Sequence, residues 1–357
     1  MHPRCETAGC RNPLGRGRRR RAAATLAGAA LIAGGCDAPR QPAPPTTTPP
    51  SAASSAAPSP APPGLSWRRL ASAPSQRTEV AAATADTRIY LVGGFARDGA
   101  TLATVEVFDA ATGRWTRGRD LPLAVNHAMA ASVGDAVYVL GGYRADRTPS
   151  SAVFRTEGGG WRPVADLPEG RAAGTAVTVG GRVYLAGGIA PGNRLADRML
   201  VYDVAADRWT AVPGPPTPRE HLGGAAFGGR VYTIGGRAAG RGNLAAFEAY
   251  DPGTGRWTAL PGLPTPRGGL AGAATCSGQV VGVGGEQPRA TFAEVEAFDV
   301  RSRSWLALPP LPTPRHGLGV VTVGTVLYAL AGGPRPGLHV SAATEALDLA
   351  RLGRCPP

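Results

Sequence analysis

The sequence predicts an all-β protein in which one structural unit is repeated six times. The six tryptophans of the chain recur at intervals of 46 to 48 residues: Trp67, Trp115, Trp161, Trp209, Trp257 and Trp305. Six glycine pairs keep the same period, at 93–94, 141–142, 187–188, 235–236, 284–285 and 332–333. Two independent markers at one period of this length indicate a solenoid, an array or a propeller.

Each repeat has the pattern of four short strands. In the fourth repeat, residues 222–227 lead through a glycine-rich turn at 228–230 into a β-branched and aromatic segment at 231–234. After a polar loop, the segment 248–251 turns through residues 252–256 into Trp257. Short segments of this composition, separated by glycine-rich turns, predict strands and no helix.

These repeats resemble kelch repeats, whose marks are a double glycine, a strand with an aromatic residue and an acid, and a tryptophan six residues later. The resemblance covers residues 65–350, and all six repeats carry both the glycines and the tryptophan. Three departures are local: Arg155 stands where the acid is expected, Val281 replaces a tyrosine, and the sixth repeat has one extra residue at 328–331. The resemblance implies a six-bladed kelch-type β-propeller, a fold that leaves only short edges because its sheets repeat radially.

The phase of the repeats predicts how the ring closes. Trp67 precedes the first glycine pair, whereas Asp348, the last acid of the pattern, has no tryptophan after it. The last blade therefore lacks its outermost strand. Residues 65–70 can supply that strand, so we expect the N-terminal strand to close the ring.

The two periodic markers are interpreted as scaffold. A tryptophan packed between blades buries roughly 150–250 Å², and truncating it to alanine typically costs about 3–5 kcal/mol. Glycines fit positions where the backbone approaches a neighbour closely or takes a positive φ.

Residues 1–35 have the pattern of an export signal. A basic run ends at Arg21, an apolar stretch occupies residues 22–32, and small residues precede Cys36. The stretch is too short for a permanent membrane span. Residues 31–36 resemble the lipobox of bacterial lipoproteins, in which the cysteine is acylated and becomes the mature N-terminus. We therefore expect an exported protein of the cell envelope, anchored by a lipid on Cys36, with ordinary cleavage as the alternative.

Residues 36–64 are predicted to be a tether, and residues 65–357 the propeller. After Cys36 the segment consists almost wholly of proline, alanine, serine and threonine, which cannot bury enough apolar surface to fold. Its prolines favour an extended polyproline conformation of about 3.1 Å per residue.

Two cysteines remain in the predicted propeller, Cys276 and Cys355. The phase of the repeats places both on one face of the ring, on neighbouring blades. Exported proteins reach compartments where disulfides persist. A disulfide that fixes the C-terminus is therefore plausible, provided that the two Cα atoms lie within about 7 Å.

Arginines recur ten residues after the tryptophans. The six positions are Arg77, Val125, Arg171, Arg219, Arg267 and Arg315. The offset places them at the start of the innermost strands, and in kelch propellers this position often lines a central pocket. Guanidinium forks suit carboxylate, sulfate or phosphate groups. The alternative is that each arginine pairs with an acid of its own repeat, for example Glu79 or Glu220, or with a backbone carbonyl there.

Further polar residues fall close to the same positions. They are Asn126, His127, His221 and His316. The histidines are candidates for acid/base groups or pocket lining, because imidazole titrates near neutrality; the alternative is that they are surface histidines of a repeated loop. Their spacing does not resemble a zinc site, and the sequence predicts no metal and no cofactor.

These observations favour a binding module over an enzyme. We expect it to recognise a protein or an acidic glycan on its arginine-bearing face. One alternative is a sugar epimerase similar to sialic acid mutarotases, which are exported six-bladed kelch proteins that bind a carboxylated sugar. Glu220, His221 or His127 would then be the acid/base group. Another is a structural envelope protein without a small ligand. Nucleic acid is not an expected partner, because about half of the net charge of +13 lies in residues 1–35 and the other arginines follow the repeat.

Overall fold

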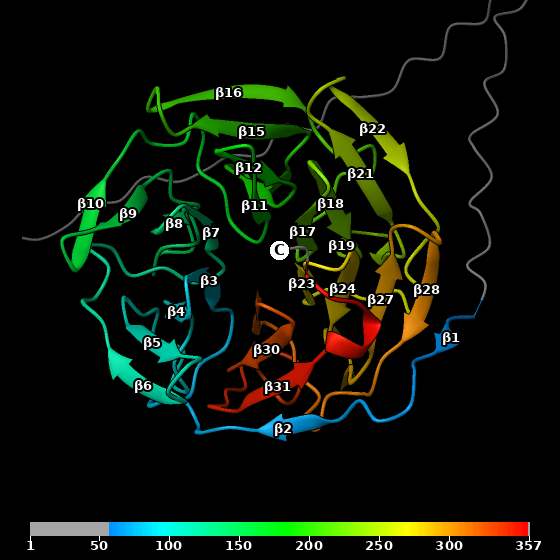
Figure 1. The fold of residues 1–357 in the computed structure, drawn as a ribbon. Helices are drawn as coiled ribbons and strands as arrows, with labels where there is room; N and C mark the ends of the chain where they lie inside the picture. The colour runs from blue at the N-terminus through cyan, green and yellow to red at the C-terminus, as the bar shows by residue number, and fades with distance from the viewer. Residues whose placement is uncertain (1–56, 356–357) are drawn as a thin grey trace, which may run out of the picture. The chain divides into compact units, whose positions relative to one another are not determined.

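Six antiparallel sheets are arranged radially around a central axis (Figure 1). The computed structural model describes residues 57–355, and the six sheets lie within them. In each sheet the innermost strand lies at the centre of the ring and the outermost at its rim (Figure 1). The predicted all-β six-bladed propeller is confirmed.

The blades are numbered I to VI along the chain, and their strands are given from the centre to the rim. Blade I comprises β3 (Ala81–Ala85), β4 (Arg88–Val92), β5 (Val105–Asp109) and β6 (Arg114–Arg117). Blade II comprises β7 (Met129–Val133), β8 (Ala136–Leu140), β9 (Val153–Glu157) and β10 (Gly160–Pro163). Blade III comprises β11 (Thr175–Val179), β12 (Arg182–Ala186), β15 (Arg198–Asp203) and β16 (Arg208–Pro213). Blade IV comprises β17 (Gly223–Phe227), β18 (Arg230–Ile234), β21 (Phe247–Asp251) and β22 (Arg256–Ala259). Blade V comprises β23 (Ala271–Ala274), β24 (Gln279–Val283), β27 (Val295–Asp299) and β28 (Ser304–Ala307). Blade VI comprises β29 (Gly319–Val323), β30 (Val326–Leu330), β31 (Thr344–Asp348) and β2 (Trp67–Arg69).

The N-terminal strand closes the ring, as predicted. Strand β2 pairs antiparallel with β31, with Trp67 opposite Leu347 and Arg69 opposite Glu345. In Figure 1 the blue β2 lies along the outer edge of the red β31. The last blade is thus built from both ends of the propeller sequence.

One further strand precedes β2. Strand β1 (Ser59–Pro60) pairs parallel with β28 and adds a fifth strand to blade V. It belongs to the predicted tether 36–64, so the end of that segment lies against the propeller. The predicted signal peptide and Cys36 lie outside the described residues. Within residues 57–355, no helix has the length and hydropathy needed to span a bilayer.

Loops between the second and third strands lie on one face of the ring. In blades III, IV and V they form short hairpins: β13 (Ile189–Ala190) with β14 (Arg194–Leu195), β19 (Arg237–Ala238) with β20 (Gly242–Asn243), and β25 (Glu286–Gln287) with β26 (Ala290–Thr291). Bridges such as Glu220 to Arg237 join each loop to the connection that enters the innermost strand. Loops and connections therefore share a face, called here the mouth face.

The glycine pairs allow neighbouring blades to approach closely. The N–H of Gly142 donates to the carbonyl of Arg171 in the next blade, at 2.8 Å. A Cβ on Gly141, which has a φ of 57°, would lie 2.2 Å from the same carbonyl oxygen. In blade VI the extra residue shifts the pair by one, and Ala331 takes the first position with a φ of 54°. There the N–H of Gly332 donates to Arg77 of blade I, which completes the circle.

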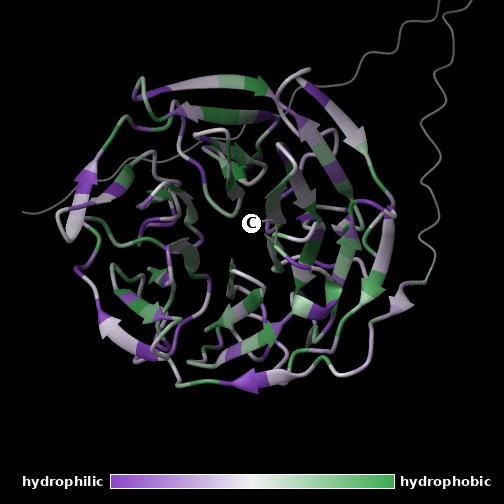
Figure 2. Cartoon of the chain, viewed as in Figure 1, coloured by the Kyte–Doolittle hydropathy of each residue, from purple (hydrophilic) through white to green (hydrophobic). Residues whose placement is uncertain are grey.

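The hydrophobic core lies between adjacent blades. Ile89 and Leu91 of blade I, for example, belong to one cluster with Leu330 and Ala346 of blade VI. Figure 2 shows hydrophobic residues along the middle strands and hydrophilic residues on rim strands such as β2 and β10. Each blade therefore needs both neighbours to bury its faces.

The tryptophans link blades, but most of them lie near the rim. Each indole Nε1 donates, at 2.8–2.9 Å, to the carbonyl four residues after the tryptophan of the preceding blade. Only Trp305 is buried, and the other five are half-buried. All six nevertheless pack against the hydrophobic clusters between blades, as predicted, and five of them keep part of their surface exposed.

The second repeat keeps its acid, but at a different position from the one predicted. Arg155 lies opposite Tyr138, in the place of Val107 opposite Tyr90 in blade I. Glu157 ends strand β9 as Asp109 ends β5. The turn that follows is shorter, because Glu157 pairs directly with Gly160.

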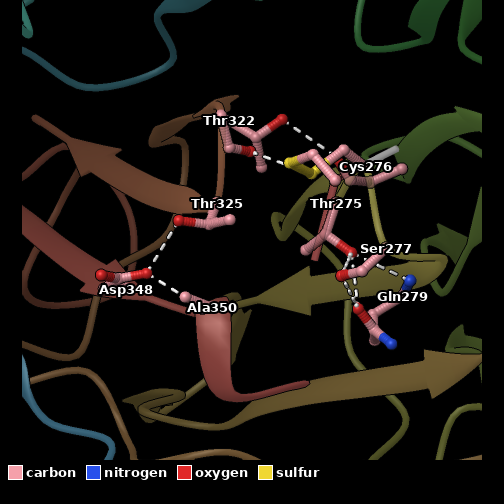
Figure 3. The surroundings of a disulfide bond; sticks show 11 residues. Thr275, Cys276, Ser277, Gln279, Thr322, Thr325, Asp348 and Ala350 are labelled. Carbon is pink, nitrogen blue, oxygen red and sulfur yellow. Dashed lines mark hydrogen bonds between the residues drawn. A yellow bond between two sulfur atoms is a disulfide. The ribbon is translucent and has the colours of Figure 1, made fainter. Parts of the chain in front are cut away.

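Cys276 and Cys355 form a disulfide with Cα atoms 4.9 Å apart, as predicted (Figure 3). Cys276 lies in the turn between β23 and β24, and Cys355 follows the short helix η1 (Ala350–Leu352). The Thr275 hydroxyl donates to the side chain of Gln279 at 2.6 Å and orders that turn. The bridge joins the end of blade VI to blade V, on the face opposite the mouth face.

Candidate functional site

The five periodic arginines are internal to their blades. Each has an exposed fraction of 0%: Arg77, Arg171, Arg219, Arg267 and Arg315. Four of them form ion pairs of 2.5–2.7 Å with a glutamate on the third strand of the same blade: Glu106, Glu248, Glu296 and Glu345. Arg171 pairs instead with Glu169, at 2.7 Å.

Most of the other hydrogen bonds of these guanidinium groups go to backbone carbonyls of the same blade. Arg267 donates to the carbonyls of Gly284 at 2.8 Å, Thr265 at 2.8 Å and Gly282 at 3.1 Å. A ligand at the mouth cannot reach these buried forks. The prediction that the five arginines line a central pocket is wrong, and the alternative of pairing within the repeat is confirmed.

In blade II, apolar residues occupy the positions of both the arginine and its glutamate partner. Val125 stands in the place of the arginine. Phe154 stands in the place of the glutamate, because Phe154 lies opposite Val139 in blade II just as Glu106 lies opposite Leu91 in blade I. Val125 and Phe154 belong to one hydrophobic cluster. Loss of both charges together fits a structural pair, because a lone buried charge is costly.

The residues that do surround the axis lie two positions further on, twelve after each tryptophan. They are called here the ring residues: Glu79, His127, Ala173, His221, Gly269 and Gly317. All six have a positive φ, between 50° and 68°. Their backbones are joined in a closed circle, because each N–H donates to the preceding ring carbonyl; only in blade I does the next residue, Val80, donate instead, to Gly317. A left-handed conformation costs energy at a non-glycine residue and is enriched at functional sites.

Three ring residues carry polar side chains that meet near the axis. His127 Nε2 lies 3.2 Å from Glu79 Oε2. The ring centroids of His127 and His221 are 4.8 Å apart, in an edge-to-face arrangement. The other ring positions are alanine or glycine, which leave the space near the axis to these three side chains.

Further side chains extend this group into a circuit around the mouth. It is called here the mouth cluster and comprises Glu79, His127, His221, Glu220, Arg237, Glu286 and His316. His221 Nδ1 bonds Glu220, and Arg237 bridges Glu220 at 2.8 Å and Glu286 at 2.7 Å. His316 Nδ1 lies 3.5 Å from Glu286 and 3.1 Å from Glu79, which closes the circuit.

The mouth cluster holds its groups in different charge states. Burial opposes ionisation of Glu79, but His127 and the hydrogen bond from His316 outweigh it, so the pKa of Glu79 is lowered. Burial lowers the pKa of His127 and, together with the charge of His127, that of His221. Burial would also lower the pKa of His316, but bonding to Glu79 and the charge of Glu286 raise it. These shifts favour the ionised form of Glu79, the charged form of His316, and the neutral forms of His127 and His221.

The cluster adjoins a central channel with a volume of about 380 Å³. Small residues of the innermost strands line it, including Ala82, Ala130, Ala176 and Gly272. The side chains of Glu79, His127 and His221 retain exposed fractions of 12%, 14% and 10%. They are nearly buried, yet they can be reached from the channel.

The mouth face also carries exposed arginines that the sequence reasoning did not identify. Every loop between second and third strands contributes at least one: Arg97, Arg144, Arg147, Arg194, Arg241, Arg289 and Arg335. Among the described residues, only Arg194 of this set forms an ion pair. Asp98, Asp146 and Asp197 lie on the same loops. The face is therefore arginine-bearing, but through its loops rather than through the buried ring.

The predicted histidines are brought together, as is Asn126, whose Oδ1 lies 2.6 Å from His127 Nδ1. Glu79 and Glu220 are not the partners of the five periodic arginines, although the sequence allows that pairing and also makes Glu220 a candidate acid/base group. Arg237 and Glu286 are not among the residues that the sequence indicates. An offset of twelve from the tryptophans identifies the ring residues. Arg237 and Glu286 directly follow their glycine pairs.

Comparison with known proteins agrees with this architecture. The family model described as KLHDC2/KLHL20/DRC7 Kelch-repeats domain matches residues 126–333, and a kelch-motif model matches residues 76–122. The Kelch-like protein terF of Aspergillus terreus is 31% identical over 165 residues, which are 41% of this chain and 36% of that protein. An F-box/kelch-repeat protein of Arabidopsis thaliana is 35% identical over 77 residues, 22% of this chain and 20% of that protein. The matches thus span only about a third and a fifth of these relatives. With its double glycines, its spaced tryptophans and six blades closed by the N-terminal strand, the chain belongs to the kelch-repeat family.

Proposed function

We propose that this protein is an exported binding module whose mouth face recognises an acidic partner. The observation that carries the proposal is the presence of an exposed arginine on each of the six loops around the mouth. Loops on a rigid scaffold are common sites of recognition. The planar guanidinium fork binds carboxylate groups in a bidentate manner.

A protein is the favoured partner, with an acidic glycan as the alternative. Kelch-repeat domains are typically protein-interaction modules. Leu338, with an exposed fraction of 48%, also lies on the mouth face, in the loop of blade VI. It is the one large hydrophobic residue among the described residues that is this exposed. An apolar contact flanked by arginines suits an acidic polypeptide surface.

Export to the cell envelope, with a lipid on Cys36, remains part of the proposal. The disulfide between Cys276 and Cys355 supports it, because disulfides are rare in reducing cytoplasm. Metabolic labelling with a fatty acid tests the anchor. Label should enter the wild-type protein and not a Cys36→Ser variant, and absence of label from both would refute lipidation.

The binding proposal is tested with two charge-matched variants of the full chain. The loop variant replaces five exposed mouth-face arginines by glutamine: Arg144, Arg147, Arg241, Arg289 and Arg335. The control variant makes the same change at five exposed arginines of the opposite face: Arg88, Arg114, Arg208, Arg256 and Arg301. A photo-crosslinking residue at position 338 then captures partners in the envelope of the producing cells.

Crosslinks should persist in the control variant and be lost in the loop variant. Binding of polyglutamate and polygalacturonate to the purified proteins distinguishes an acidic peptide from an acidic glycan. Equal behaviour of the two variants would overturn the role of the mouth face. Absence of any crosslink or binding in the wild-type protein would favour a structural envelope protein without a ligand.

A second candidate is a sugar epimerase that resembles sialic acid mutarotases. It is favoured by the clustering of Glu79, His127, Glu220 and His221 beside the channel, since such groups can transfer protons. The purified protein is mixed with freshly dissolved sialic acid, and anomer exchange is followed by NMR. Exchange above the uncatalysed rate that is lost in Glu220→Gln would support this candidate, and exchange at the uncatalysed rate would exclude it.

A further inference from the structure

Three side chains of the ring residues bring metal-binding atoms together near the axis of the propeller. One ligand atom each from Glu79, His127 and His221 lies within 4.8 Å of the other two. A tetrahedral zinc ion with bonds of about 2.0–2.1 Å holds its donors roughly 3.4 Å apart. The widest of these separations must therefore shorten by at most about 1.4 Å, shared between two side chains, for the three atoms to close around one ion.

The first histidine is held so that Nε2 faces Glu79. The amide nitrogen of Asn126 donates to Thr101 Oγ1 at 2.9 Å and to the carbonyl of Tyr143 at 3.4 Å, which fixes the orientation of the amide. Asn126 Oδ1 then accepts the Nδ1–H of His127 at 2.6 Å. In the neutral imidazole this leaves a lone pair on Nε2, 3.2 Å from Glu79 Oε2. A proton or a metal ion held between Nε2 and Oε2 would satisfy both atoms.

The second histidine is held in the same way by a carboxylate. His221 Nδ1 bonds Glu220, and Arg237 fixes the other oxygen of Glu220 at 2.8 Å. Nε2 of His221 is thereby left for the axis. Histidines that ligate metals almost always donate their other ring N–H to a carboxylate, carbonyl or amide oxygen in this way.

The carboxylate is supported from outside as well. Glu79 Oε1 contacts His316 Nδ1 at 3.1 Å, which leaves Oε2 for the axis. A Cβ on Gly317 would lie 2.6 Å from the carboxyl carbon of Glu79. Glycine in blade VI therefore makes the space that the Glu79 side chain occupies.

We propose that Glu79, His127 and His221 form a binding site for a divalent first-row transition metal ion. Two imidazoles and one carboxylate suit zinc, iron(II), copper(II) or nickel(II), whereas magnesium and calcium prefer oxygen donors. The central channel, of about 380 Å³, provides room for water or a small ligand at the open coordination positions. This site is independent of the proposed partner at the loops, and either can exist without the other.

The test uses the full-length protein, stripped with a chelator and titrated with Co²⁺ as a spectroscopic probe and with Zn²⁺ by calorimetry. We expect one ion per chain, with the visible absorption of a four- or five-coordinate cobalt site. The variants His127→Gly and His221→Gly are expected to fold, since glycine occupies the same ring position in blades V and VI with the same sign of φ. Their affinity should fall by more than the roughly 10–100-fold expected for Glu220→Gln, which removes only an outer partner.

His339→Gln is the control, because His339 lies outside the mouth cluster and bonds the carbonyl of Pro336. It should keep the wild-type affinity. Thermal unfolding of each metal-free variant checks that it is folded. The proposal is overturned if the stripped wild-type protein binds neither ion, if the glycine variants bind as tightly as wild type, or if a thiolate-to-cobalt absorption band shows that cysteines hold the metal.

Discussion

The indole Nε1 of Trp67 donates a hydrogen bond of 2.8 Å to the carbonyl of Pro309, 242 residues later in the chain. It is the same bond that joins every other pair of neighbouring blades, for example Trp209 to Ala165 at 2.8 Å. Here it joins blade V to a rim strand contributed by the start of the propeller. The closing strand β2 has only three residues, so this bond is one of the few hydrogen bonds that hold it in place.

Replacing Trp67 by alanine should therefore open the ring at its closure. We expect the free energy of unfolding to fall by about 1–3 kcal/mol, because the hydrogen bond and the packing of the half-buried ring are lost. Trp67→Phe, which keeps the ring but not the donor, should lose about 0.5–1.5 kcal/mol. Denaturant unfolding followed by circular dichroism measures both. An unchanged midpoint for Trp67→Ala would show that the closure contributes nothing to stability.

The disulfide between Cys276 and Cys355 should stabilise the propeller by about 2–4 kcal/mol, because it closes a long loop in the unfolded chain. The two cysteines are 79 residues apart. Reductant should lower the melting temperature of the wild-type protein to that of a Cys276→Ser/Cys355→Ser variant. The variant itself should not respond to reductant, and a response there would point to another thiol.

The buried pair of Arg219 and Glu248 should behave as scaffold. Removing one partner, as in Arg219→Met, leaves an uncompensated buried charge and should cost about 3–5 kcal/mol. The double variant Arg219→Val/Glu248→Phe, which copies Val125 and Phe154 of blade II, should cost less than the single change. Urea unfolding of the single and double variants completes the cycle. A single variant as stable as wild type would contradict the structural role.

The blade count, the closure and the disulfide could be predicted because they depend only on the spacing of markers along the chain. The depth of a side chain could not. The offset of ten from the tryptophans locates Arg219 correctly, but its direction is set by Glu248, which lies 29 residues further on and draws the guanidinium into the blade. The same spacing separates Arg77 from Glu106 and Arg267 from Glu296, so a paired pattern was present in the sequence.

The mouth cluster was harder to predict, because its members converge from separate repeats. His127 and His221 are 94 residues apart in the chain, and nothing local to either of them indicates a common site. Their contact follows only from the closed circle of ring residues, which places equivalent positions of different blades around one axis. The ring residues lie twelve positions after each tryptophan, whereas the arginines lie ten positions after. The sequence alone does not indicate which of these two offsets marks the residues at the axis.

The contact between blades II and III should depend on pH through Asp207. The hydroxyl of Tyr202 donates to Asp207 Oδ1, and so does the backbone N–H of Ala165, at 2.9 Å, in the connection that leaves blade II. These hydrogen bonds, that of Tyr202 first, lower the pKa of Asp207. A carboxyl whose pKa is lower in the folded than in the unfolded state stabilises the fold above its unfolded pKa of about 3.9, and this contribution is lost as the pH falls through the folded pKa.

We therefore expect Asp207→Asn to be less stable than wild type at pH 7 and the difference to shrink steadily below about pH 4. Urea unfolding at several pH values measures it, with Asp98→Asn as a control on an exposed loop. A difference that stayed constant from pH 7 to pH 3 would show that the charge of Asp207 does not stabilise this contact.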